Sequence, residues 1–225
     1  VVEDCAPALG TALRPARPTR AACFSFYATK NLTSAEGGAV ATDDEELAAF
    51  VRSYRLHGMS ADAWRRYLPG QRAAYDVTMV GIKANLPDLL AALALSQLER
   101  FDDMQARRRL LVRHYRELLT EVPGVRCFPD GLDVRGADHL MVVGLPAWAD
   151  RDRVVAAMQR AGITTSVHFI PVHRFSGLQG RFEIAGSLET CEALADRVLS
   201  LPLHPTLRLA EVARVVESLA EAVRR

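Results

Sequence analysis

The sequence predicts an α/β fold in two parts, on the basis of three features of its 225 residues. Short apolar runs typical of β-strands come first, a long helical pattern follows, and mixed strand and helix patterns close the chain. We expect residues 1–110 to form part of a sheet domain together with a bridging helix. Residues 111–225 should form a separate, small α+β domain.

Three short runs near the start are predicted to be strands. They are Val1-Val2, which ends at an acidic pair, and then residues 22–27 and 38–42. Their nearly continuous apolar character favours strands that are covered on both faces. The stretch 11–20, which is rich in Pro and Arg, is predicted to be a loop.

A helix is predicted to begin at Asp43-Asp44, because acidic residues favour the first turn of a helix. Its apolar residues then fall on one stripe, formed by Leu47, Phe50, Val51 and Tyr54. Residues 57–82 show no clear periodicity. A loop of this length is uncommon in a compact domain and tends to be functional.

Pro87 suits the first turn of a further helical pattern, which runs to Glu121 as two helices or as one bent helix. The first part of this pattern is apolar on all sides. Such a helix is expected to be buried, with another subunit as a candidate cover.

The second half of the chain alternates between strand and helix patterns. The predicted elements are a strand at 139–144, a helix at 151–161 that stops at Gly162, a strand at 164–170, and helices at 188–199 and 210–224. This order predicts the small α+β domain.

Composition and charge exclude several functions. The formal net charge of +1 gives no overall attraction to nucleic acid or to an acidic membrane surface. No apolar run reaches the roughly 20 residues of a membrane span, and no secretory signal is visible. The four cysteines form no CxxC pair, which argues against a zinc site or a disulfide framework. A cytoplasmic location is the expectation.

Lys30 follows an apolar strand, which is an unusual place for a lysine. At a sheet edge that faces a crevice its amine can be desolvated, and desolvation favours the neutral, nucleophilic form. Ser25 lies five residues earlier, and Gly37-Gly38 permits close backbone approach or positive φ. Asp4, at the end of the preceding strand, is expected at the same edge, where ligands bind in open α/β sheets.

These groups supply what pyridoxal phosphate (PLP) requires. The cofactor needs an amine, a carboxylate for its pyridine nitrogen, and donors for its phosphate. On spacing alone, however, a lysine after a strand is usually a surface residue, and an aspartate in this place is usually a helix cap. Spacing alone therefore leaves open both the PLP site and these ordinary structural roles of the two residues.

Several blocks of the sequence resemble the DegT-type sugar aminotransferase family, in family order and over nearly the whole chain. The blocks are VVEDCAPALG, ACFSFYATKNLTSAEGGAVATDD, RLHGMSADAWRR, GIKANLPDLLAALALSQLERF, GITTSVHFIPVH and LSLPLHP. The resemblance implies the C-terminal part of a fold-type I PLP-dependent transferase that acts as a homodimer. It also implies transfer of an amino group from an amino acid, glutamate for preference, to a keto-sugar nucleotide.

The resemblance also implies roles for individual residues. Lys30 matches the lysine that holds PLP as a Schiff base and moves the proton, and Asp4 matches the carboxylate under the pyridine nitrogen. Ser25 matches a hydroxyl that binds the cofactor phosphate. Asn85 matches an asparagine that reaches the phosphate of the partner subunit's PLP. His168 matches a position in the sugar-nucleotide site, although a structural histidine is an equal alternative.

The residue at position 30 distinguishes two reactions that occur among the proteins this chain resembles. Related dehydratases have His at this position, so Lys30 favours transamination. Pro7 departs from the family, whose members often have a polar residue beside the cofactor ring there; Pro has no side-chain donor or acceptor. The family's N-terminal portion is expected to be absent from the chain. An inactive fragment and a non-catalytic regulator on the same scaffold therefore stay as alternatives.

Overall fold

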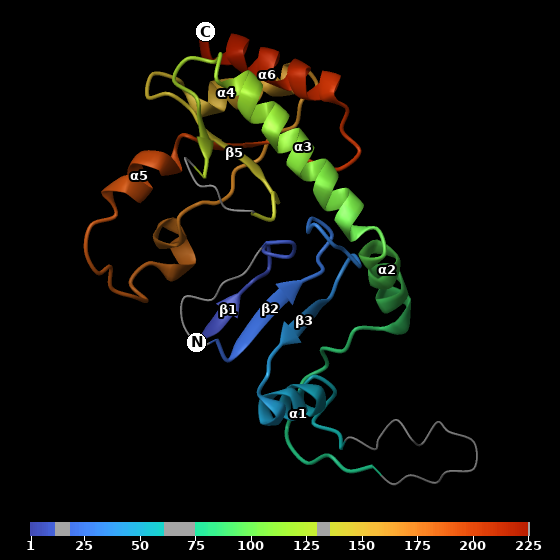
Figure 1. The fold of residues 1–225 in the computed structure, drawn as a ribbon. Coiled ribbons are helices and arrows are strands. Elements are labelled where there is room, and N and C mark those ends of the chain that lie inside the picture. Colours follow the sequence, from blue (N-terminus) through green and yellow to red (C-terminus); the bar gives the residue numbers. More distant parts are fainter. Residues whose placement is uncertain (12–18, 61–74, 130–135, 225) are drawn as a thin grey trace. The chain divides into compact units, whose positions relative to one another are not determined.

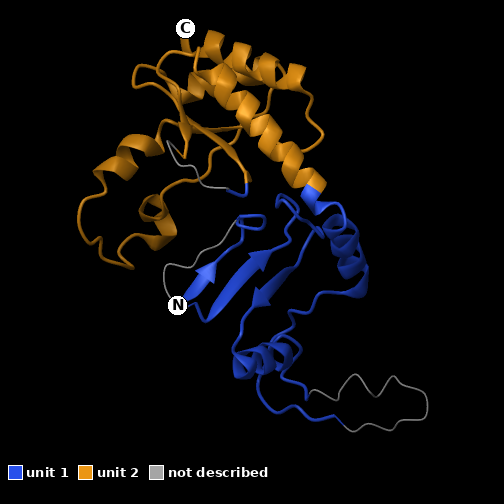
Figure 2. Cartoon of the chain, viewed as in Figure 1, with its two compact units in different colours: residues 1–102, 135–137 blue, residues 103–134, 138–225 orange. Residues whose placement is uncertain are grey.

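A computed structural model describes residues 1–11, 19–60, 75–129 and 136–224 (Figure 1). The chain divides into two compact units, residues 1–102 with 135–137 and residues 103–134 with 138–225 (Figure 2). Parts of the loops expected at 11–20 and 57–82, and of the block RLHGMSADAWRR, lie outside the described residues. The expected domain boundary at residue 110 falls within a helix of the second unit.

The first unit contains a three-stranded sheet in the order β1-β2-β3 (Figure 1). Its strands are β1 (Val2–Asp4), β2 (Ala21–Ser25) and β3 (Gly38–Ala41), which confirms the three predicted strands. β1 runs parallel to β2, with Asp4 opposite Cys23, whereas β3 runs antiparallel to β2. Because β1 and β2 are parallel, their last residues, Asp4 and Ser25, lie at the same edge of the sheet.

The predicted cover on both faces of these strands is wrong for the chain as described. All four residues of β3 are exposed, and in β2 only Ala21 is buried. The apolar pattern of a strand indicates that it needs a cover, but it does not indicate which polypeptide supplies that cover. The described residues of this unit do not provide it.

Helix α1 (Glu45–Tyr54) begins where the sequence predicted. The Asp44 carboxylate accepts the Leu47 N–H at 2.9 Å and so caps the first turn. It also accepts from Arg20 Nε at 2.9 Å. These two hydrogen bonds, the backbone one first, lower the pKa of the Asp44 carboxyl. The cap fixes the start of the helix directly after β3.

Two helices follow Pro87, as predicted: α2 (Asp88–Leu98) and α3 (Phe101–Leu119). Within the described part of its own chain α2 has no buried residue, and Leu89 is 86% exposed, so its burial against another subunit stays a prediction. Its apolar surface has no cover within its own unit. None of the helices in the described ranges is long and apolar enough to cross a membrane.

The second unit contains an antiparallel sheet in the order β4-β5-β6. Its strands are β4 (Arg126–Phe128), β5 (Met141–Gly144) and β6 (Val198–Leu201). Helix α4 (Arg151–Arg160) begins at Asp150, whose carboxylate accepts the backbone N–H groups of Asp152 and Arg153. The predicted stop at Gly162 is confirmed, since this glycine has a φ of 74°.

Two predicted elements of this unit are wrong in part. Residues 164–170 form no strand; only Ser166 pairs with Ser200, through two backbone hydrogen bonds of 3.1 and 2.7 Å. Residues 188–199 form the short helix α5 (Glu189–Ala195), after which β6 begins. Leu199, which is buried, belongs to that strand and not to the predicted helix. The prediction was wrong here because a short apolar run fits the period of a strand and that of a helix equally well. Two 3-10 turns, η2 (Val172–Arg174) and η3 (Ser176–Leu178), lie before α5.

The main hydrophobic core lies in the second unit, between its sheet and helices α3, α4 and α6 (Leu209–Arg224). The buried residues of α6 recur at intervals of three and four, as one face of a helix requires. They are Val212, Val215, Val216, Leu219, Ala222 and Val223. Tyr115 of α3 is buried in the same core, and its hydroxyl donates to the Pro202 carbonyl at 2.8 Å.

This core yields a stability prediction for Leu219, which has no exposed surface. Leu219→Ala should lower the free energy of unfolding by about 2–5 kcal/mol, because it removes buried methyl groups and leaves a cavity. Leu209→Ala, on the same helix at a side chain that is 40% exposed, is the matched control and should cost less than about 1 kcal/mol. Urea unfolding measures both. Equal losses would show that α6 does not pack by this face.

Candidate functional site

Lys30 lies in the connection between β2 and β3. The chain turns back directly after β2, and the Lys30 N–H donates to the Tyr27 carbonyl at 2.9 Å, which closes the turn. The residue is half-buried. The turn therefore holds the lysine beyond the end of β2, at the edge where β1 also ends.

The residues after Lys30 anchor this connection. Asn31, Leu32 and Ser34 are all buried, and Ser34 has no exposed surface. The Asn31 amide donates to the Ala137 carbonyl at 2.6 Å, and the Ser34 N–H donates to the Phe26 carbonyl at 2.9 Å. The lysine thus follows a fixed strand and precedes a fixed turn. Sequence reasoning missed these anchors, although small polar residues in a connection are a known signal for turns.

Gly37 and Gly38 bring the chain back into β3, and both meet the predicted need for glycine. Gly37 has a φ of 148°, and a Cβ there would lie 2.8 Å from Leu86 Cδ1. A Cβ on Gly38 would lie 2.6 Å from the Phe24 carbonyl oxygen. No side chain fits at either position without a shift. The contact with Leu86 also joins this connection to the segment that carries Asn85.

Asp4 and Ser25 end the two parallel strands, and each side chain is oriented by a local hydrogen bond. Asp4 Oδ1 accepts the Ala6 N–H at 3.0 Å, and Ser25 Oγ accepts the Tyr27 N–H at 3.2 Å. Since the Ser25 oxygen acts as acceptor there, its own hydrogen can be donated to a ligand. The strand ends at this edge therefore carry a carboxylate and a hydroxyl, and Lys30 follows on the connection after β2.

Cys5 also lies at this edge of the sheet, and its thiol is a second potential nucleophile beside the amine of Lys30. It directly follows Asp4 and is buried, with its N–H bonded to the Cys23 carbonyl at 2.8 Å. Burial, and after it the neighbouring carboxylates of Glu3 and Asp4, raise the pKa of its thiol. The thiol is therefore protonated near neutral pH and is a poor nucleophile.

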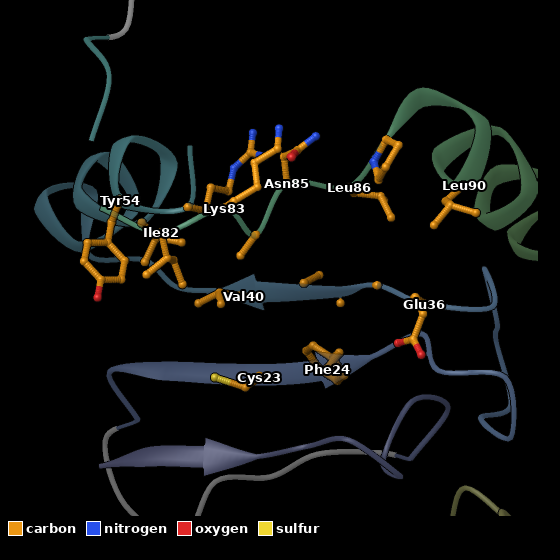
Figure 3. A pocket seen from close by; sticks show the side chains of 17 residues that line it. Cys23, Phe24, Glu36, Val40, Tyr54, Ile82, Lys83, Asn85, Leu86 and Leu90 are labelled. Atoms are coloured by element: carbon orange, nitrogen blue, oxygen red, sulfur yellow. The ribbon is translucent and has the colours of Figure 1, made fainter. Parts of the chain in front are cut away.

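Asn85 lies on the segment before α2 and lines a cavity of about 710 Å³. Figure 3 shows this cavity between strands β2 and β3 and the segment that carries Ile82, Lys83 and Asn85. Its walls are mostly apolar, with Phe24, Val40 and Leu90 among them. Asp4, Ser25 and Lys30 do not line it, so this cavity and the sheet-edge group are different places in the first unit.

His168 belongs to the second unit. Its Nδ1 lies 2.9 Å from the hydroxyl of Ser200, a buried residue of β6, and its ring meets that of Phe169 edge-on at 4.9 Å. Phe169 is 73% exposed. The imidazole is thus oriented by the sheet of its own unit, next to an exposed aromatic ring.

The chain is similar in sequence to two curated proteins, one of which is named as an aminotransferase. The UDP-4-amino-4-deoxy-L-arabinose–oxoglutarate aminotransferase of Shewanella sediminis is 35% identical, over 99% of this chain and 60% of that protein. The spore coat polysaccharide biosynthesis protein SpsC of Bacillus subtilis is 41% identical, over 91% and 54% respectively. The chain therefore spans somewhat more than half the length of these curated relatives.

Solved structures of sugar aminotransferases share the fold. PseC of Helicobacter pylori, an aminotransferase of pseudoaminic acid biosynthesis, matches 99% of this chain and 59% of its own, with a TM-score of 0.87 and 26% identity. A putative sugar aminotransferase of Streptococcus pneumoniae in its PLP form matches 99% and 57%, with a TM-score of 0.83 and 25% identity. These matches confirm the predicted fold class, part of a fold-type I PLP-dependent transferase.

The family model of the DegT/DnrJ/EryC1/StrS aminotransferases matches residues 1–220, nearly the whole chain. This match agrees with the resemblance carried by the sequence blocks. The chain belongs to the DegT/DnrJ/EryC1/StrS aminotransferase family.

Proposed function

We propose that this chain is part of a PLP-dependent aminotransferase, which moves an amino group from an amino acid, glutamate for preference, to a keto-sugar nucleotide. The observation that carries the proposal is that β1 and β2 run parallel and end at one sheet edge with Asp4 and Ser25, and that Lys30 follows on the connection after β2. Family membership supports the reaction class, and the relatives named as sugar aminotransferases support a sugar acceptor.

The donor set at this edge fits PLP. The Lys30 amine would hold the cofactor covalently, and the Asp4 carboxylate would keep the pyridine nitrogen protonated. The Ser25 hydroxyl, with its hydrogen available, would donate to the phosphate. PLP supplies an electron sink for the bonds at the amino-bearing carbon. A neutral cysteine at position 5 does not compete with the lysine as nucleophile.

Lys30 would have a second task once its amine is released from the cofactor. A free amine at this place can take a proton from the amino-bearing carbon of the donor and return one to the carbon of the acceptor. The anchored turn around Asn31 and Ser34 fixes the backbone next to the lysine, which suits a proton shuttle between fixed positions. His could not form the covalent attachment, which is why a lysine favours transamination over dehydration.

Asn85 would act on the partner subunit's cofactor phosphate. Two features support a homodimer with Asn85 at its interface. The residue lies three positions before α2, and α2 leaves Leu89, Leu95 and Leu98 at least 55% exposed. Exposed apolar surface of this extent on one helix is typical of an interaction surface.

The two halves of the chain would have different tasks. We assign residues 1–110 to the cofactor-binding domain and residues 111–225 to the small domain. The small domain would supply His168 to the sugar-nucleotide site.

The first test is amino transfer by the purified, PLP-loaded protein. UDP-4-amino-4-deoxy-L-arabinose and 2-oxoglutarate, the pair in the name of the Shewanella relative, serve as substrates, and glutamate formation is measured. Lys30→Ala and Lys30→Arg should both lower the rate by roughly 10²–10⁴-fold or more, because the arginine keeps the charge but not the nucleophilic amine. Near-normal activity of Lys30→Arg would contradict the covalent role. No transfer by the native sequence would favour the inactive fragment or the regulator.

A second test addresses Asn85 and uses mixed subunits. Lys30→Ala and Asn85→Ala should each be nearly inactive alone. When the two variants are mixed and reassembled, each heterodimer should regain one native site, built from Lys30 of one subunit and Asn85 of the other. Random pairing then predicts about a quarter of native activity. If Asn85 served its own subunit, mixing would restore nothing.

A further inference from the structure

A small hollow lies in the second unit, next to the loop between β5 and α4. Its volume is about 190 Å³, and its walls come from β4, from that loop and from the chain around the end of α5. Two aromatic rings and two cations line it, those of Phe128, Trp148, Arg126 and Arg197. No acid is found among the described residues that line it. We call it the Trp148 hollow.

The indole of Trp148 is held in place although the residue is 69% exposed. Its benzene edge lies against Gly124, since a Cβ on that glycine would be 2.6 Å from Trp148 Cη2. Gly124 has a φ of 74°, which glycine adopts without strain. The Leu145 N–H donates to the Arg197 carbonyl at 2.9 Å and fixes the start of the loop. A ring that is fixed before binding loses little conformational entropy when a ligand stacks on it.

The ring of Phe128 is placed in a similar way. A Cβ on Gly144 would lie 2.9 Å from Phe128 Cε2, so this glycine leaves the room that the ring occupies. The guanidinium of Arg126 lies over the Phe128 ring, 5.7 Å from its centroid, which is within the range of a cation–π contact. The hollow therefore has a second ordered ring, with a cation stacked on it.

Arg197 provides the second cation. Its Nε donates to the Ala193 carbonyl at 2.7 Å, which orients the guanidinium at the end of α5. Within the part of the chain that the structure describes, Arg197 forms no ion pair. The neighbouring carboxylate of Asp196 is paired with Arg174 instead, at 2.7 Å. The charge of Arg197 is therefore available to an anion.

The surroundings limit the size and the position of a ligand. An adjoining hollow shares Arg197 but is also lined by Asp150, Asp152 and Asp196, whose carboxylates repel an anion. A negatively charged group is therefore favoured in the Trp148 hollow and not in its neighbour. Sites for drug-sized ligands measure roughly 300–1,000 Å³, so the smaller Trp148 hollow suits a single ring with a short charged substituent.

We propose that the Trp148 hollow binds a small ligand in which a flat ring carries a negatively charged group. The ring stacks on Trp148, and the anionic group accepts hydrogen bonds from Arg197 and Arg126. A nucleoside monophosphate and an aromatic carboxylic acid share this chemistry. The site uses none of the residues proposed for amino transfer, so it is a second binding site of the chain.

The test uses the fluorescence of Trp148. The chain has two tryptophans, and Trp64→Phe leaves Trp148 as the only one. This variant, loaded with PLP, is titrated with uridine 5′-monophosphate and, separately, with phenylacetate. At least one probe should change the Trp148 emission in a saturable way, and the probe with the lower Kd identifies the source of the ligand. Uridine has the ring without the charge and should bind at least about tenfold more weakly than its monophosphate.

Substitutions in the same Trp64→Phe background test the role of the cations. Arg197→Met should raise the Kd of the probe by about 10–100-fold, through loss of a charge-assisted hydrogen bond. Arg126→Met should also raise it, which keeps the test valid if Arg197→Met fails to fold. Arg160→Met is the matched control, because Arg160 is an exposed cation in the last turn of α4 that does not line the hollow. It should change the Kd by less than about twofold.

Two results would overturn the proposal. One is the lack of a saturable change in Trp148 emission with either probe up to about 10 mM. The other is saturable binding that Arg197→Met and Arg126→Met both leave unchanged. Whether the chain transfers amino groups does not affect either result, because the first unit takes no part in this site.

Discussion

The backbone pairing between β1 and β2 determines where the chemical groups of the candidate site lie. Parallel pairing with Asp4 opposite Cys23 brings the ends of both strands to one edge, and the connection after β2 adds Lys30 there. A slip of one residue in this register would turn the Asp4 side chain to the opposite face of the sheet. The buried residues Asn31 and Ser34 anchor the backbone of that connection directly after the lysine.

The two units differ in how well they bury their own apolar residues. The second unit encloses a continuous core in which Leu111, Val143 and Leu219 have no exposed surface. The first unit leaves β3 and α2 open, although both have the apolar composition of covered elements. This contrast supports the proposed homodimer. In such a dimer, Asn85 can serve a site that the sheet of its own chain does not form.

Local rules predicted much of the fold. The acidic turn at Asp44, the proline before α2 and the glycine after α4 were found from capping and backbone preferences, which act within a few residues. The strand at 198–201 was missed because its leucines fit a helical period as well, and only pairing with β5 decides between them. The site was harder to predict than the fold. A lysine after a strand indicates no particular chemistry by itself, and only the parallel pairing of β1 with β2 brings Asp4 and Ser25 to the edge from which the connection with Lys30 starts. The anchors of its turn depend on contacts such as Asn31 with Ala137, which no local pattern indicates.

We propose that the cofactor attaches to Lys30. Because the chain contains only two lysines, reduction of the PLP-loaded protein with borohydride followed by peptide mass mapping decides this directly. The pyridoxyl mass should appear on the peptide that contains Lys30, and the peptide that contains Lys83 should remain unmodified. Label on Lys83, or no stable label in a protein that has bound PLP, would contradict it.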